Sequence, residues 1–345
     1  MKRFFWMVAL LGMCAAFSGC GAETPERVQS VDTAMGTVIQ QSIYKAGEDT
    51  DSAGEILGLI RSLEEDLLSR RLESSEVYAV NQAAGSPEGQ IISEELAQML
   101  EQCLEMTERS DGAFDVTLGP VIRLWDIDGW AAGIQGGEFQ PPVEEELALA
   151  LSLCGSRKMR LERGESGSRL YLEEGMELDL GAVGKGLALT EILAYLKEHN
   201  AISGAVISVG GSVLTYGEKP DGAGWRVGVA DPREPALNLG VIVLEGQWCV
   251  STSGDYERYV ETGGIRYHHI LDPATGYPAD SGLCSVTVVT KDGLLSDALS
   301  TACFVLGREK GMELARLYGA EALFISNDGS ISMTPGMEAI FQPAQ

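Results

Sequence analysis

The stretch MELDLGAVGKGLALTEILAYLKEH, residues 176–199, joins two different structural patterns through a run of glycines. Its first five residues, Met176 to Leu180, predict a short strand, which Gly181 breaks. From Lys185 to His199 the apolar side chains recur with the three- and four-residue spacing of a helix. The stretch therefore predicts a strand, a glycine turn and a helix in succession.

The glycine turn, residues 181–186 (GAVGKG), is a candidate anion site. Backbone N–H groups at a helix N-terminus carry partial positive charge and have no partners within the helix, so a phosphate can bind there. The turn has neither the Walker A spacing nor a GxGxxG pattern. A tight turn that merely lets two elements pack closely explains the glycines at least as well.

The sequence on both sides of this stretch mixes helical and strand patterns. The predicted helices are Ser52 to Leu68, Ser93 to Arg109, Val143 to Leu153, Ser296 to Leu306 and Glu309 to Tyr318. The predicted strands are Lys158 to Leu161, Arg169 to Leu172, Ala205 to Val209, Ser212 to Tyr216, Trp225 to Ala230, Leu239 to Leu244, Cys249 to Thr252, Cys284 to Thr290, Ala322 to Ile325 and Ser330 to Met333.

Two further segments complete this outline. Val31 to Tyr44 predicts either a strand pair or one long strand interrupted at Met35. Asp126 to Pro142 is rich in glycine and predicts a long loop, either an insertion or a lid. Because the turns between strands favour antiparallel pairing, the predicted fold class is α+β.

Composition excludes several classes of function. The chain has 345 residues, and 25 basic against 51 acidic residues give a net charge of −26. A surface this acidic repels phosphate backbones, so nucleic acid is an improbable partner. With three histidines and no CxxC or HExxH motif, zinc chemistry with nitrogen and sulfur ligands is nearly excluded.

The N-terminus has the features of an export signal. Lys2 and Arg3 precede the apolar run Phe4 to Phe17, which is too short to span a bilayer as a mature helix. The boundary Ser18-Gly19-Cys20 resembles the lipobox of bacterial lipoproteins, in which the cysteine thiol becomes lipidated. The alternative is an ordinary secreted protein with a small-residue cleavage site. The lipoprotein interpretation places the protein on the extracytoplasmic face of a bacterial cell membrane, held by its lipid.

This interpretation divides the chain into four parts. Residues 1–19 form a lipoprotein signal peptide, 20–29 a tether that begins at the lipidated Cys20, 30–335 the folded domain and 336–345 a C-terminal tail. No polybasic patch assists the membrane anchor, so lipid must supply it. Five cysteines remain beyond Cys20, an odd number among apolar neighbours, which favours buried thiols over a disulfide framework.

A second candidate site lies at the start of the predicted helix near Ser296. Asp297 and Thr301 are separated by four residues and share one helix face, so two hard oxygen ligands point the same way. Oxygen ligands of this kind suit Mg²⁺ far better than zinc or copper. Considered alone, the pair is explained better by an Asp that caps the helix and a Thr that bonds the carbonyl four residues back.

Two loop-rich segments also concentrate functional residue types. GIRYHHILDPATGYP, residues 264–278, holds two of the three histidines, and neighbouring side chains on a strand point to opposite faces. At most one of His268 and His269 therefore serves any given site. DGAFDVTLGP, residues 111–120, predicts by itself a structured loop and no more.

These four segments, in this order and preceded by Met35-Gly36-Thr37, resemble the ApbE family of FAD:protein FMN transferases. Three shorter stretches are also similar to that family: VGGS at 209–212, WRVGVADP at 225–232 and TSGDYERY at 252–259. The likeness extends from about Ser30 to about Pro335. It implies an ApbE-like, T-fold-like α+β architecture, with antiparallel or mixed sheets and flanking helices.

The resemblance implies a magnesium-dependent enzyme that splits FAD, releases AMP and joins FMN through a phosphodiester to a threonine or serine of an exported redox protein. By position, Asp297, Thr301 and the backbone carbonyl of Ala182 would hold Mg²⁺. His269 would stand near the transferred phosphate and act as the catalytic base. The residues that would contact FAD are Met35, Ala113, Phe114, Asp115, Asp179, Lys185 and Ile270.

Elementary electrostatics supports the assignment, because a dianionic diphosphate must bind a protein of net charge −26. Mg²⁺, a helix N-terminus and Lys185 would supply the local positive charge. Two alternatives stay open at this point: an FAD pyrophosphatase that yields free FMN and AMP, and a lipoprotein that binds FAD without chemistry. The pair of metal-binding oxygens argues against the second but does not distinguish transfer from hydrolysis.

Overall fold

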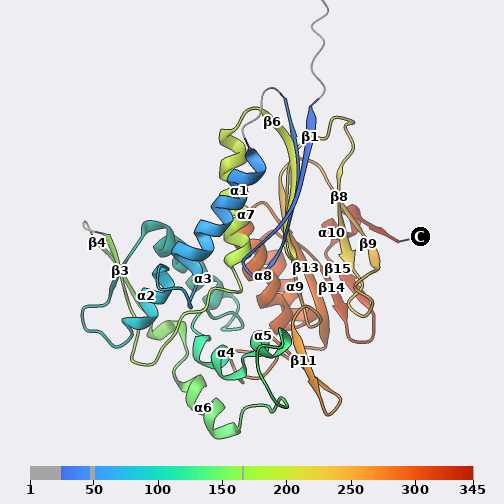
Figure 1. Cartoon of the computed structure of the whole chain (residues 1–345). Coiled ribbons are helices and arrows are strands. Elements are labelled where there is room, and N and C mark those ends of the chain that lie inside the picture. Colours follow the sequence, from blue (N-terminus) through green and yellow to red (C-terminus); the bar gives the residue numbers. More distant parts are fainter. Residues whose placement is uncertain (1–24, 47–50, 165–166, 345) are drawn as a thin grey trace, which may run out of the picture.

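A computed structural model describes residues 25–46, 51–164 and 167–344 of the chain. An eight-stranded sheet crosses the molecule (Figure 1), and every pairing between its strands is antiparallel. In spatial order its strands are β1 (Glu26–Ala34), β2 (Thr37–Lys45), β6 (Ile202–Val209), β7 (Ser212–Gly217), β10 (Trp248–Gly254), β13 (Leu283–Thr290), β14 (Glu321–Ser326) and β15 (Ile331–Met333). The α+β class with antiparallel sheets is confirmed.

Helices cover one face of this sheet and a small second sheet covers the other, as Figure 1 shows. The helices are α1 (Ser52–Ser62), α7 (Gly184–Glu198), α8 (Gly293–Leu306) and α9 (Arg308–Leu317). The opposite face carries β8 (Trp225–Ala230), β9 (Asn238–Leu244), β16 (Phe341–Pro343) and α10 (Pro335–Ile340). Because both faces are covered, β13 is buried at all eight positions.

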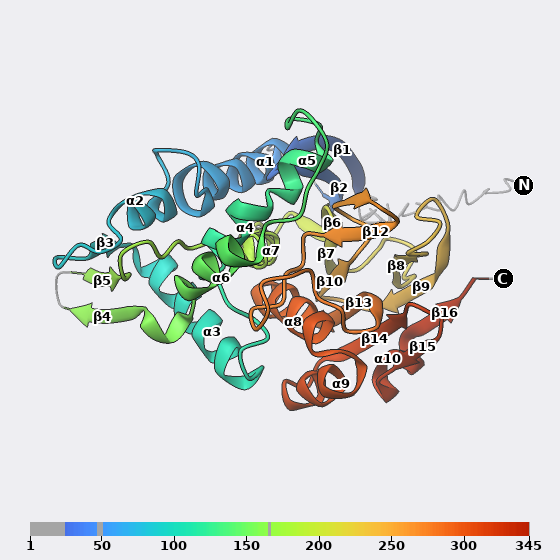
Figure 2. The same ribbon diagram turned by 90° about the horizontal axis from the view of Figure 1, so that it is seen from below.

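The remaining elements form a second region beside the helical layer (Figure 2). They are the π-helix Leu63–Leu68, α2 (Glu76–Gln82), β3 (Gln90–Ile92), α3 (Glu94–Arg109), α4 (Gly119–Trp125), α5 (Ile127–Ala131), α6 (Glu144–Ser152), the short 3₁₀ helix Ser156–Lys158, β4 (Arg160–Gly164), β5 (Gly167–Tyr171), β11 (Tyr259–Thr262) and β12 (Ile265–His268). An aromatic cluster of Trp125, Phe139 and Tyr267 packs α4 against the β11–β12 hairpin.

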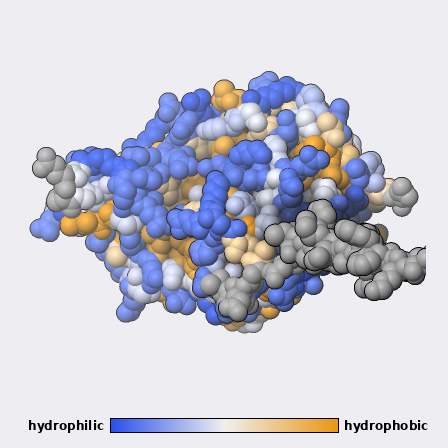
Figure 3. Space-filling model, turned by 90° about the horizontal axis from the view of Figure 1, so that it is seen from above, coloured by the Kyte–Doolittle hydropathy of each residue, from blue (hydrophilic) through white to orange (hydrophobic). Residues whose placement is uncertain are grey.

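Most predicted elements are confirmed within a few residues. The predicted Val31 to Tyr44 segment is a hairpin, with Met35 and Gly36 at its turn in left-handed backbone. The Asp126 to Pro142 loop contains the short helix α5, and Phe139 near its end is buried. Surface side chains on the face seen from above are mainly hydrophilic (Figure 3), as the composition requires.

The predicted strand Met176 to Leu180 is wrong. Its backbone groups bond to scattered partners, so no ladder forms beyond a single parallel bridge between Leu118 and Glu177. The Asn81 side chain accepts from the Leu178 N–H at 2.7 Å and donates to the Leu178 carbonyl at 3.0 Å. The Asp179 N–H donates to the Val116 carbonyl. A side-chain amide thus replaces the neighbouring strand that the pattern alone predicted.

Two predicted domain boundaries also need correction. β1 begins at Glu26, inside the predicted 20–29 tether, because Glu26 pairs with Lys45 and the register continues unbroken to Ala34. The predicted 336–345 tail belongs to the fold over residues 336–344: Met337 of α10 is fully buried, and β16 pairs with β9. Cys20 and the signal peptide lie outside the described residues.

The described residues contain neither a disulfide bond nor a helix that could span a membrane. The cysteines there are all buried and free, as predicted: Cys103, Cys154, Cys249, Cys284 and Cys303. Burial raises their pKa, to about 12 for Cys103, so these thiols stay protonated. None of the helices in residues 25–46, 51–164 and 167–344 is both long and apolar enough to cross a bilayer.

Candidate functional site

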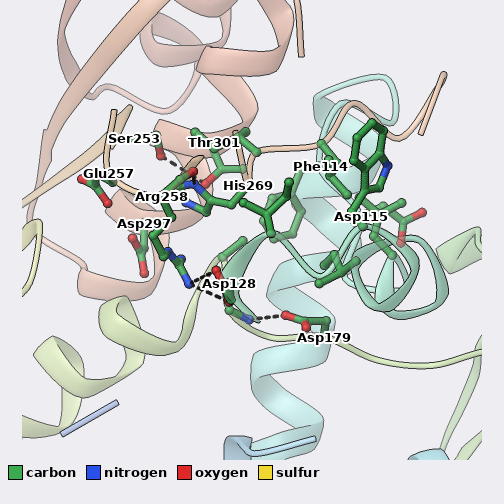
Figure 4. Close-up of a pocket in the computed structure, with 18 of the residues that line it drawn as sticks. Phe114, Asp115, Asp128, Asp179, Ser253, Glu257, Arg258, His269, Asp297 and Thr301 are labelled. Carbon is green, nitrogen blue, oxygen red and sulfur yellow. Dashed lines mark hydrogen bonds and ion pairs between the residues drawn. The ribbon is translucent and has the colours of Figure 1, made fainter. Parts of the chain in front are cut away.

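A cavity lies where the two regions of the fold meet, and most of the predicted site residues line it (Figure 4). Its walls come from the 113–118 stretch, α4 and α5, the glycine turn, α8, and the loops around residues 252–258 and 269–273. The predicted residues in its lining are Ala113, Phe114, Asp115, Asp179, Ala182, Lys185, His269, Ile270, Asp297 and Thr301. Stretches separated by almost two hundred residues therefore meet at one site.

The glycine turn meets α8 because Gly186 has no side chain. A Cβ atom placed there would lie 2.4 Å from the Gly293 carbonyl oxygen and 2.7 Å from the Asp297 Cβ. This close approach lets the Gly186 N–H donate to Asp297 Oδ2 at 2.9 Å. The turn thus serves packing and site geometry together, and it brings the two candidate sites into one.

Asp297 is a buried carboxylate that faces the cavity. It does not cap α8, because Asp292 takes that role and accepts from the Leu295 N–H at 2.8 Å. Asp297 is 3% exposed, and Oδ1 accepts from Ser212 Oγ at 3.3 Å. Lys185 Nζ lies 3.6 Å from the same oxygen, so it balances the charge without a close hydrogen bond. The capping explanation for Asp297 is therefore wrong.

Hydroxyl oxygens surround the same end of the cavity. Thr301 Oγ1 lies 3.3 Å from Ser253 Oγ, which is 2.8 Å from Ser300 Oγ. No group of three or more His, Cys, Asp and Glu side chains in the described part of the chain is placed to hold a metal. One buried carboxylate with hydroxyl and carbonyl oxygens nearby fits a hard cation that keeps several waters, such as Mg²⁺.

His269 lies at the centre of the cavity lining (Figure 4). Its Nδ1 is 3.2 Å from the Arg258 carbonyl oxygen, and its backbone N–H donates to the same oxygen at 3.1 Å. A carbonyl only accepts, so Nδ1 carries the proton and Nε2 is left with a free lone pair. Burial, with help from the Arg258 and Lys185 charges, holds the pKa of His269 well below its usual range. The imidazole is therefore neutral at pH 7.

His268 is directed away from the cavity, as the strand alternation predicts. Its Nδ1 accepts from the Ile270 N–H at 3.3 Å, and its Nε2 donates to the Ala279 carbonyl at 3.1 Å. The side chain is buried against Phe304. Both ring nitrogens are thus occupied within the fold, and His268 has a structural role.

Asp115 lines the cavity, but both of its carboxylate oxygens accept hydrogen bonds from neighbouring protein groups. Oδ1 accepts from the Thr117 N–H at 2.8 Å and from the Thr117 and Ser156 hydroxyls at 2.6 Å each. Oδ2 accepts from the Ser156 N–H at 3.0 Å. These bonds fasten the 113–118 stretch to the loop that follows α6. Ala113 and Phe114, both buried, supply the apolar wall beside it.

Asp179 is held by two partners at the entrance to the glycine turn. Arg70 Nε lies 2.7 Å from Oδ2, and the Gly181 N–H donates to Oδ1 at 2.9 Å. The carboxylate thereby shapes the turn and brings a guanidinium group to the cavity. Met35 is outside the cavity lining: it lies at the β1–β2 turn, packed against Gly184.

Sequence reasoning missed several polar residues of the lining: Arg70, Arg71, Asp128, Ser253, Glu257 and Arg258. Three of them lie in the TSGDYERY stretch, residues 252–259. Its similarity to the ApbE family marked the stretch as a whole, but nothing in it indicated which side chains face the cavity. Burial raises the pKa of Glu257, Asp297 adds to that effect, and Lys185 and Arg258 oppose it. The other three come from loop or helix ends that have no recognisable pattern.

Comparisons with known proteins agree on one family. The model of the ApbE family matches residues 35–324. A FAD:protein FMN transferase of Treponema pallidum is 33% identical over 352 residues, covering 96% of this chain and 94% of that protein. One from Klebsiella pneumoniae is 34% identical, covering 90% and 92%.

Solved structures give the same result for the fold. The apo form of the flavinyl transferase ApbE from Pseudomonas stutzeri has a TM-score of 0.78 at 30% identity, covering 93% of this chain and 99% of that one. The flavin transferase ApbE from Vibrio cholerae has a TM-score of 0.79 at 26% identity, covering 92% and 99%. The chain, most of whose resemblance-carrying segments line the cavity, belongs to the ApbE family.

Proposed function

We propose that this chain is a FAD:protein FMN transferase that releases AMP from FAD and attaches FMN through a phosphodiester to a threonine or serine of an exported redox protein. The observation that carries the proposal is the convergence, in one cavity, of the glycine turn, Asp297 with Thr301, and a neutral His269. The names of the relatives, FAD:protein FMN transferase, support it.

The cavity supplies positive charge and apolar walls where FAD needs each of them. The N-terminus of α7 faces this cavity, and although the Gly184 and Gly186 N–H groups already bond to the Leu180 carbonyl and Asp297, the positive end of the helix dipole favours the diphosphate. Lys185 and Arg70 add charge at the same end. Phe114 and Ile270, both buried, offer surfaces against which an aromatic ring system packs.

Magnesium fits the oxygen-rich end of this cavity. Asp297, Thr301 and the Ala182 carbonyl would hold it, with waters as further ligands. When bound, Mg²⁺ supplies charge neutralisation at the phosphoryl oxygens. From α8, only Asp297 and Thr301 line the cavity. Ser300 lies between them in sequence but is fully buried and outside the lining, so it would not be a metal ligand.

His269 supplies the base for attack on the flavin-side phosphorus. Its free Nε2 takes the proton of the acceptor hydroxyl as the new oxygen–phosphorus bond forms, and the bond to AMP breaks with its electrons leaving on the AMP phosphate. The hydrogen bond from Nδ1 to the Arg258 carbonyl fixes the ring in the tautomer that this step requires.

The direct test is mass spectrometry of a threonine-containing acceptor domain incubated with the protein, FAD and Mg²⁺. We expect the acceptor to gain the mass of one FMN bound as an ester and free AMP to appear in equal amount. Free FMN and AMP with an unmodified acceptor would indicate a pyrophosphatase. FAD recovered intact would indicate a protein that binds FAD without chemistry.

We also propose that the protein is a lipoprotein anchored through Cys20 on the extracytoplasmic face of the cell membrane. The support is the short apolar run of residues 4–17 and the Ser18-Gly19-Cys20 boundary. A strand that begins at Glu26 leaves a tether of a few residues after Cys20, so the anchor would hold the domain close to the bilayer. An acceptor embedded in the same membrane would be within its reach.

A further inference from the structure

A salt bridge on the cavity lining joins two segments that are far apart in the sequence. Arg258 Nη1 lies 2.9 Å from each carboxylate oxygen of Asp128 (Figure 4). Asp128 belongs to α5 and Arg258 precedes β11; both residues line the cavity, and α5 packs against β11. The bridge therefore adds a charged contact between two lining segments that already touch.

The α5 wall is part of a flap, which we define as residues 126–139. Asp126 at its start has left-handed backbone with φ of 42°, and residues 132–138 are all exposed. Phe139 at its end is buried in the aromatic cluster with Trp125 and Tyr267. Ile127 beside Asp128 is buried in the same cluster, so apolar packing anchors both ends of the flap and the Asp128–Arg258 pair adds a charged contact at the near end.

Arg258 connects this flap to the proposed base. The carbonyl of the same residue accepts hydrogen bonds from the backbone N–H and Nδ1 of His269. A shift of Arg258 that follows the flap would move the acceptor that fixes the His269 tautomer. The bridge thereby links closure of the cavity to the orientation of the imidazole.

We propose that Asp128 is a positioning residue that keeps the flap closed over the cavity through Arg258 and so favours attack by the acceptor hydroxyl over attack by water. The inference rests on the proposed function. Both reactions break the same bond to AMP and differ in the nucleophile, so exclusion of water changes the partition between them. Closure also holds His269 in place for the larger nucleophile.

The Asp128–Arg258 bridge is weak enough to break each time an acceptor protein enters the cavity. The two side chains are 44% and 41% exposed, and exposed ion pairs of this kind change an equilibrium by about twofold to fivefold. The bridge therefore breaks readily, and its loss shifts the balance between the closed and open flap without unfolding the domain. Loss of the bridge should therefore change the product ratio more than the melting temperature.

The experiment compares the ratio of free FMN to acceptor-bound FMN for wild type and Asp128→Asn, with FAD, Mg²⁺ and a threonine-containing acceptor domain. We expect the ratio to rise about twofold to fivefold in Asp128→Asn. It should rise in the same direction in Asp128→Ala and return close to the wild-type value in Asp128→Glu, which retains the carboxylate. A structural role alone would lower both products together.

A matched control is available outside the cavity lining. Glu101 of α3 forms a similar pair with Arg163, with bonds of 2.9 and 2.8 Å, away from the cavity lining. Glu101→Gln should leave the product ratio unchanged. An unchanged ratio in Asp128→Asn, or an equal rise in Glu101→Gln, overturns the inference while wild-type transfer stands. A wild-type protein that attaches no FMN overturns the proposed function and this inference together.

Discussion

His269 and His268 are neighbours in sequence, but hydrogen bonds give them different chemistry. His269→Ala should lower the rate of transfer by about a hundredfold to ten-thousandfold, the usual cost of removing a general base, with FAD affinity nearly intact. His268→Ala is the control and should change the rate little, because both of its ring nitrogens bond to backbone groups and its side chain is not in the cavity lining. Single-turnover kinetics with FAD titrations checks both variants. The reverse order would make His269 structural.

The pH dependence of the same step follows from the direction of the His269 shift. Burial keeps the pKa of this imidazole well below 6.5, so the neutral, proton-accepting form persists as the pH falls through the usual range for histidine. We therefore expect kcat/KM to stay constant as the pH falls past 6.5. It should decline only at a still lower pH, where Nε2 becomes protonated. An acid limb centred at 6.5 or above would contradict the neutral base.

Asp297 is the residue whose loss should affect metal dependence most. Asp297→Asn preserves an oxygen that can accept from the Gly186 N–H, so the packing of α7 on α8 should survive. The neutral amide would bind Mg²⁺ far less well, and a metal at a transferring phosphoryl group contributes several kcal/mol. Turnover should fall about a thousandfold, with circular dichroism unchanged. Full activity of this variant, or of wild type in excess EDTA, would contradict the metal site.

Among the elements, the contact between α7 and α8 is set by one glycine. Gly186→Ala would place a Cβ atom 2.4 Å from the Gly293 carbonyl oxygen, and overpacking of this kind costs about 1–3 kcal/mol. FAD binding should weaken as well, because the turn and Asp297 must move apart. Gly58→Ala in α1 is the control: nothing lies within 4 Å, and replacing a helical glycine there should stabilise the protein by up to about 1 kcal/mol. Urea unfolding of the two variants measures the difference.

The C-terminal elements α10 and β16 provide a test of the corrected domain boundary. Truncation after Thr334 removes the fully buried Met337, the Met337 N–H that donates to Glu321 Oε2 at 3.0 Å, and the pairing of Phe341 with Ile242. Loss of the methionine alone costs about 2–5 kcal/mol, and the truncation should cost at least that much. An unchanged urea midpoint would mean that these residues form a dispensable tail.

Some of these elements could be predicted from the sequence and some could not, for identifiable reasons. Helix α3 was found within one residue because Ser93 caps it and apolar residues repeat along one face. The strand at Met176 was not, because the Asn81 amide that replaces its neighbour lies almost a hundred residues earlier. The tail was missed because Met337, Ile340 and Phe341 are too few to show a period.

In the candidate site too, some residues could be predicted from the sequence and others could not. Asp297 and Thr301 could be paired from their helical spacing, but considered alone they were better explained as a cap and a back-bonded hydroxyl. Burial and the contact with Gly186, across 111 residues of sequence, are what separate the two explanations. Asp128 gave no local signal at all, because its importance depends on Arg258, 130 residues away.

The charge of the whole molecule determines how it can be held at a membrane. A net charge of −26 repels anionic headgroups, so a lipid on Cys20 would have to supply the whole of the attachment. Cys20→Ala should therefore yield unprocessed precursor or protein released from the membrane fraction. Its activity on soluble FAD and acceptor should be unchanged, because Cys20 precedes the first described strand and the cavity lining begins at Arg70. Fractionation with mass measurement checks this, and a variant that stays with the membrane at the mature mass would show that Cys20 is not the anchor.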